Sequence, residues 1–234
     1  MQFPRPLVTG TLLRRYQRFL ADVRLDSGEQ VTVHCPNTGS MLGLKAPGNR
    51  VWLLPADKPG RKLAWTWEMV EADGVSVGIH TGRANGLVRE ALEVGLLPKL
   101  AGFTTCRAEA PLSARSRTDL LLTFPSGPCY VEVKSVTAAV TEGIGFFPDA
   151  VSDRAAKHVR ELAEAVSGGA RAAVVFCVQR GDVNEVRPAD HIDPVFAHAL
   201  RQAAGQGVEL YALGASVSQA GIRLERPLNV NLEG

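Results

Sequence analysis

The chain has 234 residues, 45% of them apolar, and a formal net charge of +2, so it can bury one large core or two modest ones. The first 82 residues carry ten Lys and Arg against seven Asp and Glu, which points weakly to nucleic acid but excludes a strongly basic DNA-binding footprint. No apolar run reaches about 18 residues and the N-terminus lacks a signal-peptide core, so we expect a cytoplasmic protein without a membrane partner.

The first third of the chain has the pattern of short strands separated by turn residues. Breaks such as Asp26-Ser27-Gly28, Ala46-Pro47-Gly48 and Asp73-Gly74 separate the strand-like segments. Turns at such intervals favour a small barrel, and a barrel of the OB type binds oligonucleotides or oligosaccharides through one face and its loops. The predicted strands cover residues 9–13, 18–25, 30–34, 51–55, 63–70 and 75–79.

Three arginines of this region, Arg14, Arg15 and Arg18, form the densest cationic cluster and are candidate nucleic-acid contacts. Most of the nearby rings are expected to fill the barrel core, so the arginines carry more of this prediction than the aromatics do. The loop that contains Asn37 and Thr38 is a second candidate, because side-chain amides, hydroxyls and backbone N–H groups at a glycine turn can hold phosphate oxygens.

The four cysteines give no sign of a metal or disulfide framework. Cys35, Cys106, Cys129 and Cys177 are widely scattered and form no C-x-x-C pair, which argues against a zinc ribbon. His34 beside Cys35 does not make a ligand pair either, because adjacent residues on a strand point to opposite faces. We expect Cys35 to be structural.

After Gly82 the hydrophobic period changes from that of strands to an alternation of helices and strands. This pattern predicts an α/β sandwich with a mixed sheet and divides the chain into residues 1–82 and 83–234. The predicted helices cover residues 84–94, 152–166 and 194–204. The predicted strands cover residues 120–124, 130–136, 170–177, 208–213 and 222–224.

The most informative feature is a predicted hairpin, whose two strands carry Asp119 and then Glu132 and Lys134. Side chains two apart on a strand share a face, and Asp119 reaches that face if the strands pair. Two carboxylates can hold Mg²⁺ or Mn²⁺, and a lysine beside them can orient water or neutralise charge on a phosphate. The spacing is short, however, so an exposed ion pair on an ordinary surface hairpin is an equal alternative.

Two helices supply further candidates. Glu90 shares a helix face with Leu87, Ala91 and Val94, and a carboxylate on an apolar stripe is costly unless it is paired or binds metal. Arg154 and Lys157 lie on a polar stripe of the helix that begins near Ser152 and could contact phosphate. The alternatives are a stripe-edge glutamate that reaches solvent and a solvated helix face.

Together with these motifs, seven blocks of the sequence are informative, at residues 14–23, 34–41, 66–68, 81–85, 116–119, 130–137 and 147–151. In this order they resemble the bacterial and archaeal sugar fermentation stimulation protein A family over nearly the whole chain. The resemblance implies an N-terminal OB-fold barrel joined to a domain like the PD-(D/E)xK nucleases, with nonspecific DNA binding and a regulatory role at sugar-utilisation genes. It also implies that the acidic and basic members of such a site fall on Glu90, Asp119, Glu132 and Lys134.

Two functions remain open from the sequence. The first is a metal-dependent nuclease that acts on DNA, and the second is a catalytically silent, nonspecific DNA-binding regulator with the same fold. Retention of both acids and the lysine favours the first, because a silent domain has no chemical need for all three. The sequence shows no helix-turn-helix signal for base readout, and it leaves the oligomeric state, including a homo-oligomer, open.

Overall fold

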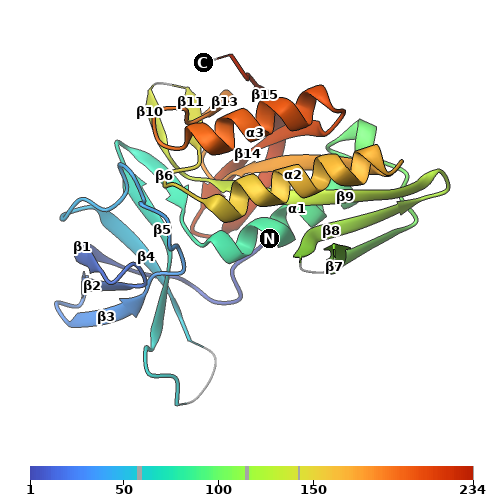
Figure 1. Cartoon of the computed structure of the whole chain (residues 1–234). Coiled ribbons are helices and arrows are strands. Elements are labelled where there is room, and N and C mark those ends of the chain that lie inside the picture. Colours follow the sequence, from blue (N-terminus) through green and yellow to red (C-terminus); the bar gives the residue numbers. More distant parts are fainter. Residues whose placement is uncertain (57–59, 114–115, 142, 234) are drawn as a thin grey trace.

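The computed structural model describes residues 1–56, 60–113, 116–141 and 143–233, which form a β-barrel followed by an α/β sandwich (Figure 1). In the described part of the barrel the strands are hydrogen-bonded in the order β3-β2-β1-β4-β5-β6, and a β3–β5 pairing closes the barrel. The strands are β1 (Val8–Tyr16), β2 (Leu20–Leu25), β3 (Gln30–His34), β4 (Arg50–Pro55), β5 (Trp65–Ala72) and β6 (Val75–Gly78).

The barrel closes around a core made of alternate side chains of each strand. Leu12, Val23, Val33 and Leu53 are completely buried there, and Trp67 packs among them. The expectation that Cys35 is structural is met, since its thiol lies in the same core. The OB-type barrel predicted from the turn spacing is thus confirmed.

The second part is built on one mixed sheet with the strand order β10-β11-β13-β15-β14-β12-β9-β8-β7. β12 is parallel to both of its neighbours, whereas β7, β8 and β9 form an antiparallel meander. The strands are β7 (Thr105–Ser113), β8 (Ser116–Phe124), β9 (Gly127–Val136), β10 (Ala139–Thr141), β11 (Ile144–Phe147), β12 (Arg171–Val178), β13 (Glu185–Pro188), β14 (Glu209–Ser218) and β15 (Gly221–Val230).

Helices cover both faces of this sheet and create two cores (Figure 1). α1 (Ala84–Glu93) packs on one face, whereas α2 (Asp153–Ser167) and α3 (Pro194–Gly205) pack on the other. Short 3₁₀ turns, η1 (Thr81–Arg83) and η2 (Pro98–Leu100), flank α1. No helix in the described ranges is both long and apolar enough to cross a membrane.

The ends of α2 follow from its sequence and place it over the middle of the sheet. The hydroxyl of Ser152 accepts a hydrogen bond from the backbone N–H of Ala155, as expected of an N-cap, and Gly169 adopts φ 90° after the last turn. Because α2 begins there, its first two turns lie against β9. The polar residues Glu132 and Lys134 of the predicted hairpin lie in this part of β9.

Four strands were not predicted, and each lacks a clear alternation. β7 is an edge strand that is mostly exposed and contains Pro111, which cannot donate to a ladder. β10, β11 and β13 have only three or four residues each. Strands of this kind are held by their neighbours in the sheet and not by their own hydrophobic pattern.

Candidate active site

The predicted hairpin consists of β8 and β9, which pair antiparallel from Leu120↔Val131 to Phe124↔Gly127. Val131 and Val133 of β9 point into the core under α1. Glu132 and Lys134 point to the opposite face, toward α2, as the alternation along the strand predicts. The two polar side chains therefore enter the gap between the sheet and the start of α2.

Asp119 lies one residue before Leu120, the first residue of β8 that pairs with β9, and its carboxylate takes the place of a strand partner on that side. Its Oδ2 accepts a hydrogen bond from the backbone N–H of Val133 at 2.8 Å, and its Oδ1 accepts one from Nδ2 of Asn85 at 3.0 Å. Burial, followed by repulsion from Glu132, raises the pKa of Asp119. The carboxylate is fixed beside Glu132 by one strand and one helix.

Glu132 is only 4% exposed, and its two oxygens have different roles. Oε1 accepts hydrogen bonds from Nζ of Lys134 and from Nδ1 of His158, both at 2.8 Å. Oε2 is buried and has no hydrogen-bond partner in the described part of the chain. A buried carboxylate oxygen without a partner is costly, so this atom points to a ligand that the protein itself does not supply.

The charge state of Glu132 follows from these contacts. Burial acts to raise its pKa, but the hydrogen bond from His158 and the ammonium of Lys134 outweigh burial and hold the pKa below its usual value. Since an ionised carboxylate only accepts hydrogen bonds, Nδ1 of His158 must be the donor. Glu132 is thus kept ionised and its side chain is held in one orientation.

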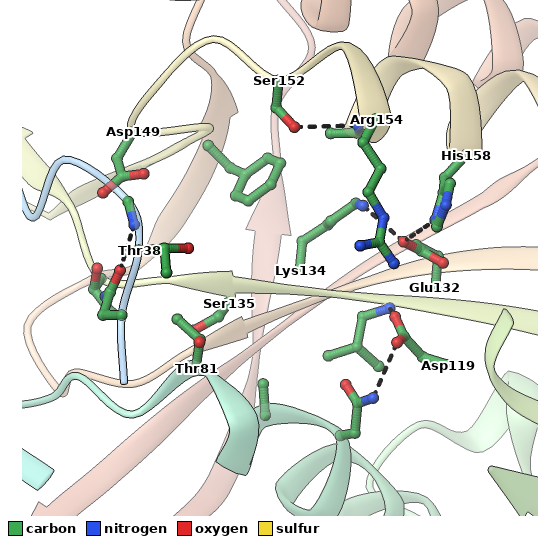
Figure 2. A pocket seen from close by; sticks show the side chains of 18 of the residues that line it. Thr38, Thr81, Asp119, Glu132, Lys134, Ser135, Asp149, Ser152, Arg154 and His158 are labelled. Carbon is green, nitrogen blue, oxygen red and sulfur yellow. Dashed lines mark hydrogen bonds and ion pairs between the residues drawn. The ribbon is translucent and has the colours of Figure 1, made fainter. Parts of the chain in front are cut away.

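Two cavities share this acidic pair in their lining. Figure 2 shows side chains that line the smaller one. One has a volume of about 390 Å³ and the other about 780 Å³. Both are lined by Asp119, Glu132, Arg154 and His158. Arg154 extends from the first turn of α2 toward Glu132, which brings a guanidinium close to the carboxylates.

The smaller cavity is closed on one side by the barrel loop that carries Asn37 and Thr38. Nη2 of Arg15 donates to the carbonyls of Asn37 and Gly39 at 2.8 and 2.9 Å, which fixes the loop from within the barrel. Oδ2 of Asp149 accepts from the backbone N–H of Met41 at 2.9 Å, which fixes it from the second domain. The barrel therefore contributes a wall to a cavity whose acids lie in the sheet.

The predicted phosphate contacts fall into two groups. Arg154 and Lys157 line the cavities, although Lys157 also lies 3.7 Å from Glu161 on the same helix. Arg14 and Arg18 are exposed on the barrel and line neither cavity, and Nε of Arg14 is 2.7 Å from Oδ2 of Asp22. The guanidinium of Arg15 is not available to a phosphate in the same way, because its Nη2 donates to backbone carbonyls.

The structure places Glu90 away from the other acids, in contrast to the expectation. Its side chain is 50% exposed, and Oε2 lies 2.6 Å from the amino group of Met1. Leu87 and Ala91 of the predicted apolar stripe are buried, but α1 also buries Val88 and Leu92 and leaves Val94 79% exposed, so its buried face turns away from Val94. Glu90 consequently lies at the border of the buried face and outside both cavities.

Sequence reasoning missed two polar neighbours of the acidic pair. Asn85 precedes Glu90 on α1 and contacts Asp119, and His158 contacts Glu132. His158 lies on the same helix as Arg154 and Lys157, and nothing in the sequence distinguishes its buried ring from these more exposed neighbours. The sequence feature that could have identified Asn85 is its position in the first turn of α1, where the end of a helix meets the sheet.

The donor set fits a hard divalent cation. Asp119 and the unpartnered Oε2 of Glu132 are carboxylate oxygens, the ligands that Mg²⁺ uses one or two at a time while it keeps several waters. No three His, Cys, Asp or Glu side chains converge on one point in the described ranges, so a dedicated all-protein cage is absent there. Lys134 lies within the same cavity, with its ammonium 5.8 Å from the centre of the Phe147 ring.

Comparison with known proteins agrees with this architecture. Residues 13–79 match the family model described as SfsA N-terminal OB domain, and residues 82–221 match that of the sugar fermentation stimulation protein RE domain. Sugar fermentation stimulation protein homologs of Halorhodospira halophila and Thioalkalivibrio sulfidiphilus are 56% and 55% identical, and the alignments cover 100% and 99% of this chain and 99% and 98% of theirs. The structure of Pyrococcus furiosus SfsA in complex with Ca²⁺ matches with a TM-score of 0.88 at 29% identity, over 99% of this chain and 98% of that one. The chain therefore belongs to the sugar fermentation stimulation protein family.

Proposed function

We propose that this chain is a divalent-metal-dependent phosphodiesterase that cleaves DNA without sequence preference. The observation that carries the proposal is the buried, unpartnered Oε2 of Glu132, which lines the same cavity as Asp119 and Lys134. A carboxylate pair with one free oxygen and an adjacent lysine is an arrangement suited to phosphoryl chemistry.

Asp119 and Glu132 are the residues that would hold the metal, either Mg²⁺ or Mn²⁺. A bound ion of this kind polarises a phosphoryl oxygen and lowers the pKa of a coordinated water. The related Pyrococcus furiosus protein was solved in complex with Ca²⁺, another hard cation that prefers oxygen ligands. This supports a divalent-cation site in the family.

The other residues of the site prepare it for an anionic substrate. His158 and Lys134 both bind Oε1 of Glu132 and so leave Oε2 for the ligand. The ammonium of Lys134 is in position to offset negative charge that grows on a phosphate in the transition state. Arg154, which lines both cavities, is the available partner for a neighbouring phosphate.

The cavities also favour a nucleic-acid backbone over a small substrate. The carboxylates lie where the two cavities meet, so a chain could continue past them in both directions. Asn37 and Thr38 line one of these directions and Lys157 the other. Contacts of this kind to sugar and phosphate carry no base information, which agrees with nonspecific binding.

A catalytically silent DNA-binding regulator is the second candidate, and one observation favours it. The ammonium of Lys134 donates to Oε1 of Glu132 at 2.8 Å, so the lysine already has a role in satisfying a buried acid. In a silent protein this ion pair would be purely structural, and phosphate binding would rest on Arg154 and Lys157.

A cleavage assay separates the two candidates. Pure protein is incubated with single-stranded, nicked, flapped and double-stranded DNA, with Mg²⁺, Mn²⁺ or chelator, and product is measured in a single turnover. The nuclease requires metal-dependent product on at least one substrate form. Absence of such product on every form would reject the nuclease and leave the regulator.

The variant Lys134→Ala tests the role of the lysine within the same assay. We expect it to retain most of its DNA affinity but to lose turnover by about 100-fold or more, because its charge is needed chiefly in the transition state. Arg223→Ala, an exposed change that lies outside both cavities, is the matched control and is expected to cleave like the wild type. Equal turnover of the wild type and Lys134→Ala would remove the lysine from the chemistry.

A further inference from the structure

The barrel carries another cavity, about 540 Å³ in volume, which lies outside the candidate active site. We call it the Phe19 pocket. It lies at the β1–β2 turn, on strands β2 and β3, and beside the segment that leads into β5. Its lining includes Phe19, Leu20, Thr32, His34, Arg61 and Lys62.

Phe19 is an exposed aromatic side chain in the lining of this pocket. It is 49% exposed, whereas Trp52 and Trp67 of the same barrel are buried. The turn that presents it contains Gln17 at φ 48° and Arg18 at φ 63°, a left-handed conformation that costs free energy for residues with side chains. The turn holds the exposed ring at the edge of the pocket, where the ring can stack on a ligand.

Arg61 is held in place at the side of the pocket. Its Nη1 donates to Oγ1 of Thr66 at 3.1 Å, and its Nη2 lies 3.3 Å from Nδ1 of His34. Burial and the charge of Arg61 lower the pKa of His34, so a neutral ring can accept this hydrogen bond. Lys62 follows directly and is exposed.

We propose that the Phe19 pocket binds single-stranded DNA, with one base stacked on Phe19 and the adjacent phosphates on Arg61 and Lys62. The described lining contains these two cations and no carboxylate, which is complementary to a polyanion. A base can stack on a side chain only where it is not enclosed in a duplex, so the ring selects a single strand. A neutral oligosaccharide would leave both cations without a counter-charge.

The position of the pocket connects it to the candidate active site. Nη2 of Arg15 donates to the carbonyl of Arg18, next to Phe19, and also to those of Asn37 and Gly39 in the cavity wall. A DNA strand bound at Phe19 would therefore lie close to the loop that forms one wall of the cavity of Asp119 and Glu132. Only this last step, delivery of the strand to the acids, rests on the proposed function.

The binding step is tested without metal. Fluorescence anisotropy in chelator measures the affinity for a labelled oligothymidine of about 15 nucleotides. Phe19→Ala should weaken binding by about 5- to 100-fold, whereas Phe19→Trp, which keeps a stacking ring, should bind like the wild type or more tightly. Val94→Ala removes an even more exposed apolar side chain, at the end of α1, and is expected to leave the affinity unchanged.

The cations are tested by the salt dependence of the same binding curves. Arg61→Ala and Lys62→Ala should each reduce the slope of log affinity against log salt by about 0.7. Thermal melting of each variant verifies that the fold is intact. Unchanged affinity of Phe19→Ala, tighter binding of a duplex of the same length, or equal binding of a neutral oligosaccharide would overturn the proposal.

The test also separates this inference from the nuclease. If no substrate is cleaved but Phe19→Ala still loses binding, the proposed binding site is supported and the nuclease function is rejected. If cleavage occurs and Phe19→Ala binds like the wild type, the proposed binding site is rejected and the nuclease function is supported.

Discussion

The two oxygens of Glu132 differ, because one is held by hydrogen bonds within the fold and the other is free to bind a ligand. Its Oε1 receives two hydrogen bonds from charged or polar donors, and its Oε2 receives none from the described residues. Asp119 differs, since each of its oxygens already accepts a hydrogen bond from an N–H group. The two acids are therefore unequal, and substitutions of them have different consequences.

Glu132→Gln is the cleaner of the two tests for metal binding. The amide oxygen can keep the hydrogen bonds from Lys134 and His158, and the amide nitrogen then takes the position of the free Oε2. We expect Mg²⁺ or Mn²⁺ to raise the melting temperature of the wild type by mass action and to leave that of Glu132→Gln unchanged. Equal metal-induced shifts in the two proteins would show that the acids do not bind the ion.

Asp119→Asn should behave differently in the absence of metal. The new amide keeps both contacts only if its oxygen faces the N–H of Val133 and the amide of Asn85 turns over to present its own oxygen, and both hydrogen bonds then lose their charged acceptor. We expect a loss of about 1–3 kcal/mol in unfolding free energy, measured by denaturant titration in chelator. Glu93→Gln, in an exposed pair with Arg89, is the control and should change stability by less than about 1 kcal/mol.

Arg15 and Arg14 are neighbours in sequence but differ in what they contact. Nη2 of Arg15 is surrounded by three backbone carbonyls, whereas Arg14 is exposed and contacts Asp22. Arg15→Ala should lower unfolding free energy by about 1–3 kcal/mol, because partly buried carbonyls lose their donor. Arg14→Ala is the matched comparison and should have little effect; equal destabilisation by both changes would contradict the anchoring role of Arg15.

At the scale of elements, the end of β12 is held to the rest of the fold by Arg180. Its buried guanidinium donates to both oxygens of Asp182, at 2.6 and 2.7 Å, and to the carbonyl of Thr137. The backbone of Arg180 also bridges to Val77 at the end of the barrel. The hydrogen bond from Arg180 lowers the pKa of Asp182.

This pair predicts a pH dependence. Because the folded-state pKa of Asp182 is lowered, its contribution to stability is present above the unfolded carboxyl pKa of about 4 and is lost as pH falls through the folded value. Asp182→Asn should cost about 1–2 kcal/mol at neutral pH, a figure reduced for the partial exposure of Asp182, and this cost should shrink in acid. Denaturant titrations of both proteins from neutral to acidic pH provide the check. A difference in unfolding free energy that stays the same at every pH would show that the negative charge of Asp182 does not stabilise the fold.

Elements with a strong local pattern were predictable from the sequence. The alternation around Glu132 identified β9 and the face that carries the acid, and Ser152 marked the start of α2. The phase of α1 was not predictable in the same way. Its ten residues offer two overlapping apolar stripes, and packing against β9 and β15 selected the one that excludes Glu90.

The rest of the site depends on contacts between segments that are far apart in the chain. Asn85 and Asp119 are 34 residues apart, and His158 and Glu132 are 26 apart. No spacing rule connects a polar residue on a helix to an acid on a strand until the sheet order is known. The same holds for Arg15, whose carbonyl partners lie in a loop that folds back across the barrel.

At the scale of the whole molecule, the two parts meet at the candidate active site. Asp149 of the second part accepts a hydrogen bond from the loop of the first, and Oγ1 of Thr81 donates to the carbonyl of Pro36 in that loop. Arg83 makes two hydrogen bonds to the carboxylate of Glu68, which is completely buried in the barrel. The wall of the smaller cavity therefore depends on how the parts are docked.

Gly39 is the point at which this docking can be tested. A Cβ atom built there would lie 2.5 Å from Oδ1 of Asp149 and 2.6 Å from Oδ2, which is too close for any real contact. Gly39→Ala must therefore push the loop away from Asp149, so we expect a lower melting temperature and weaker metal-dependent cleavage if the chain is a nuclease. Gly86→Ala is the matched control, because its Cβ would meet nothing within 4 Å, and an alanine within a helix should raise stability by about 0.5–1 kcal/mol. Thermal melting and limited proteolysis of the two variants give the measurement. A Gly39→Ala protein as stable and as protease-resistant as the wild type would mean that the barrel loop and the second part are not held together at Asp149.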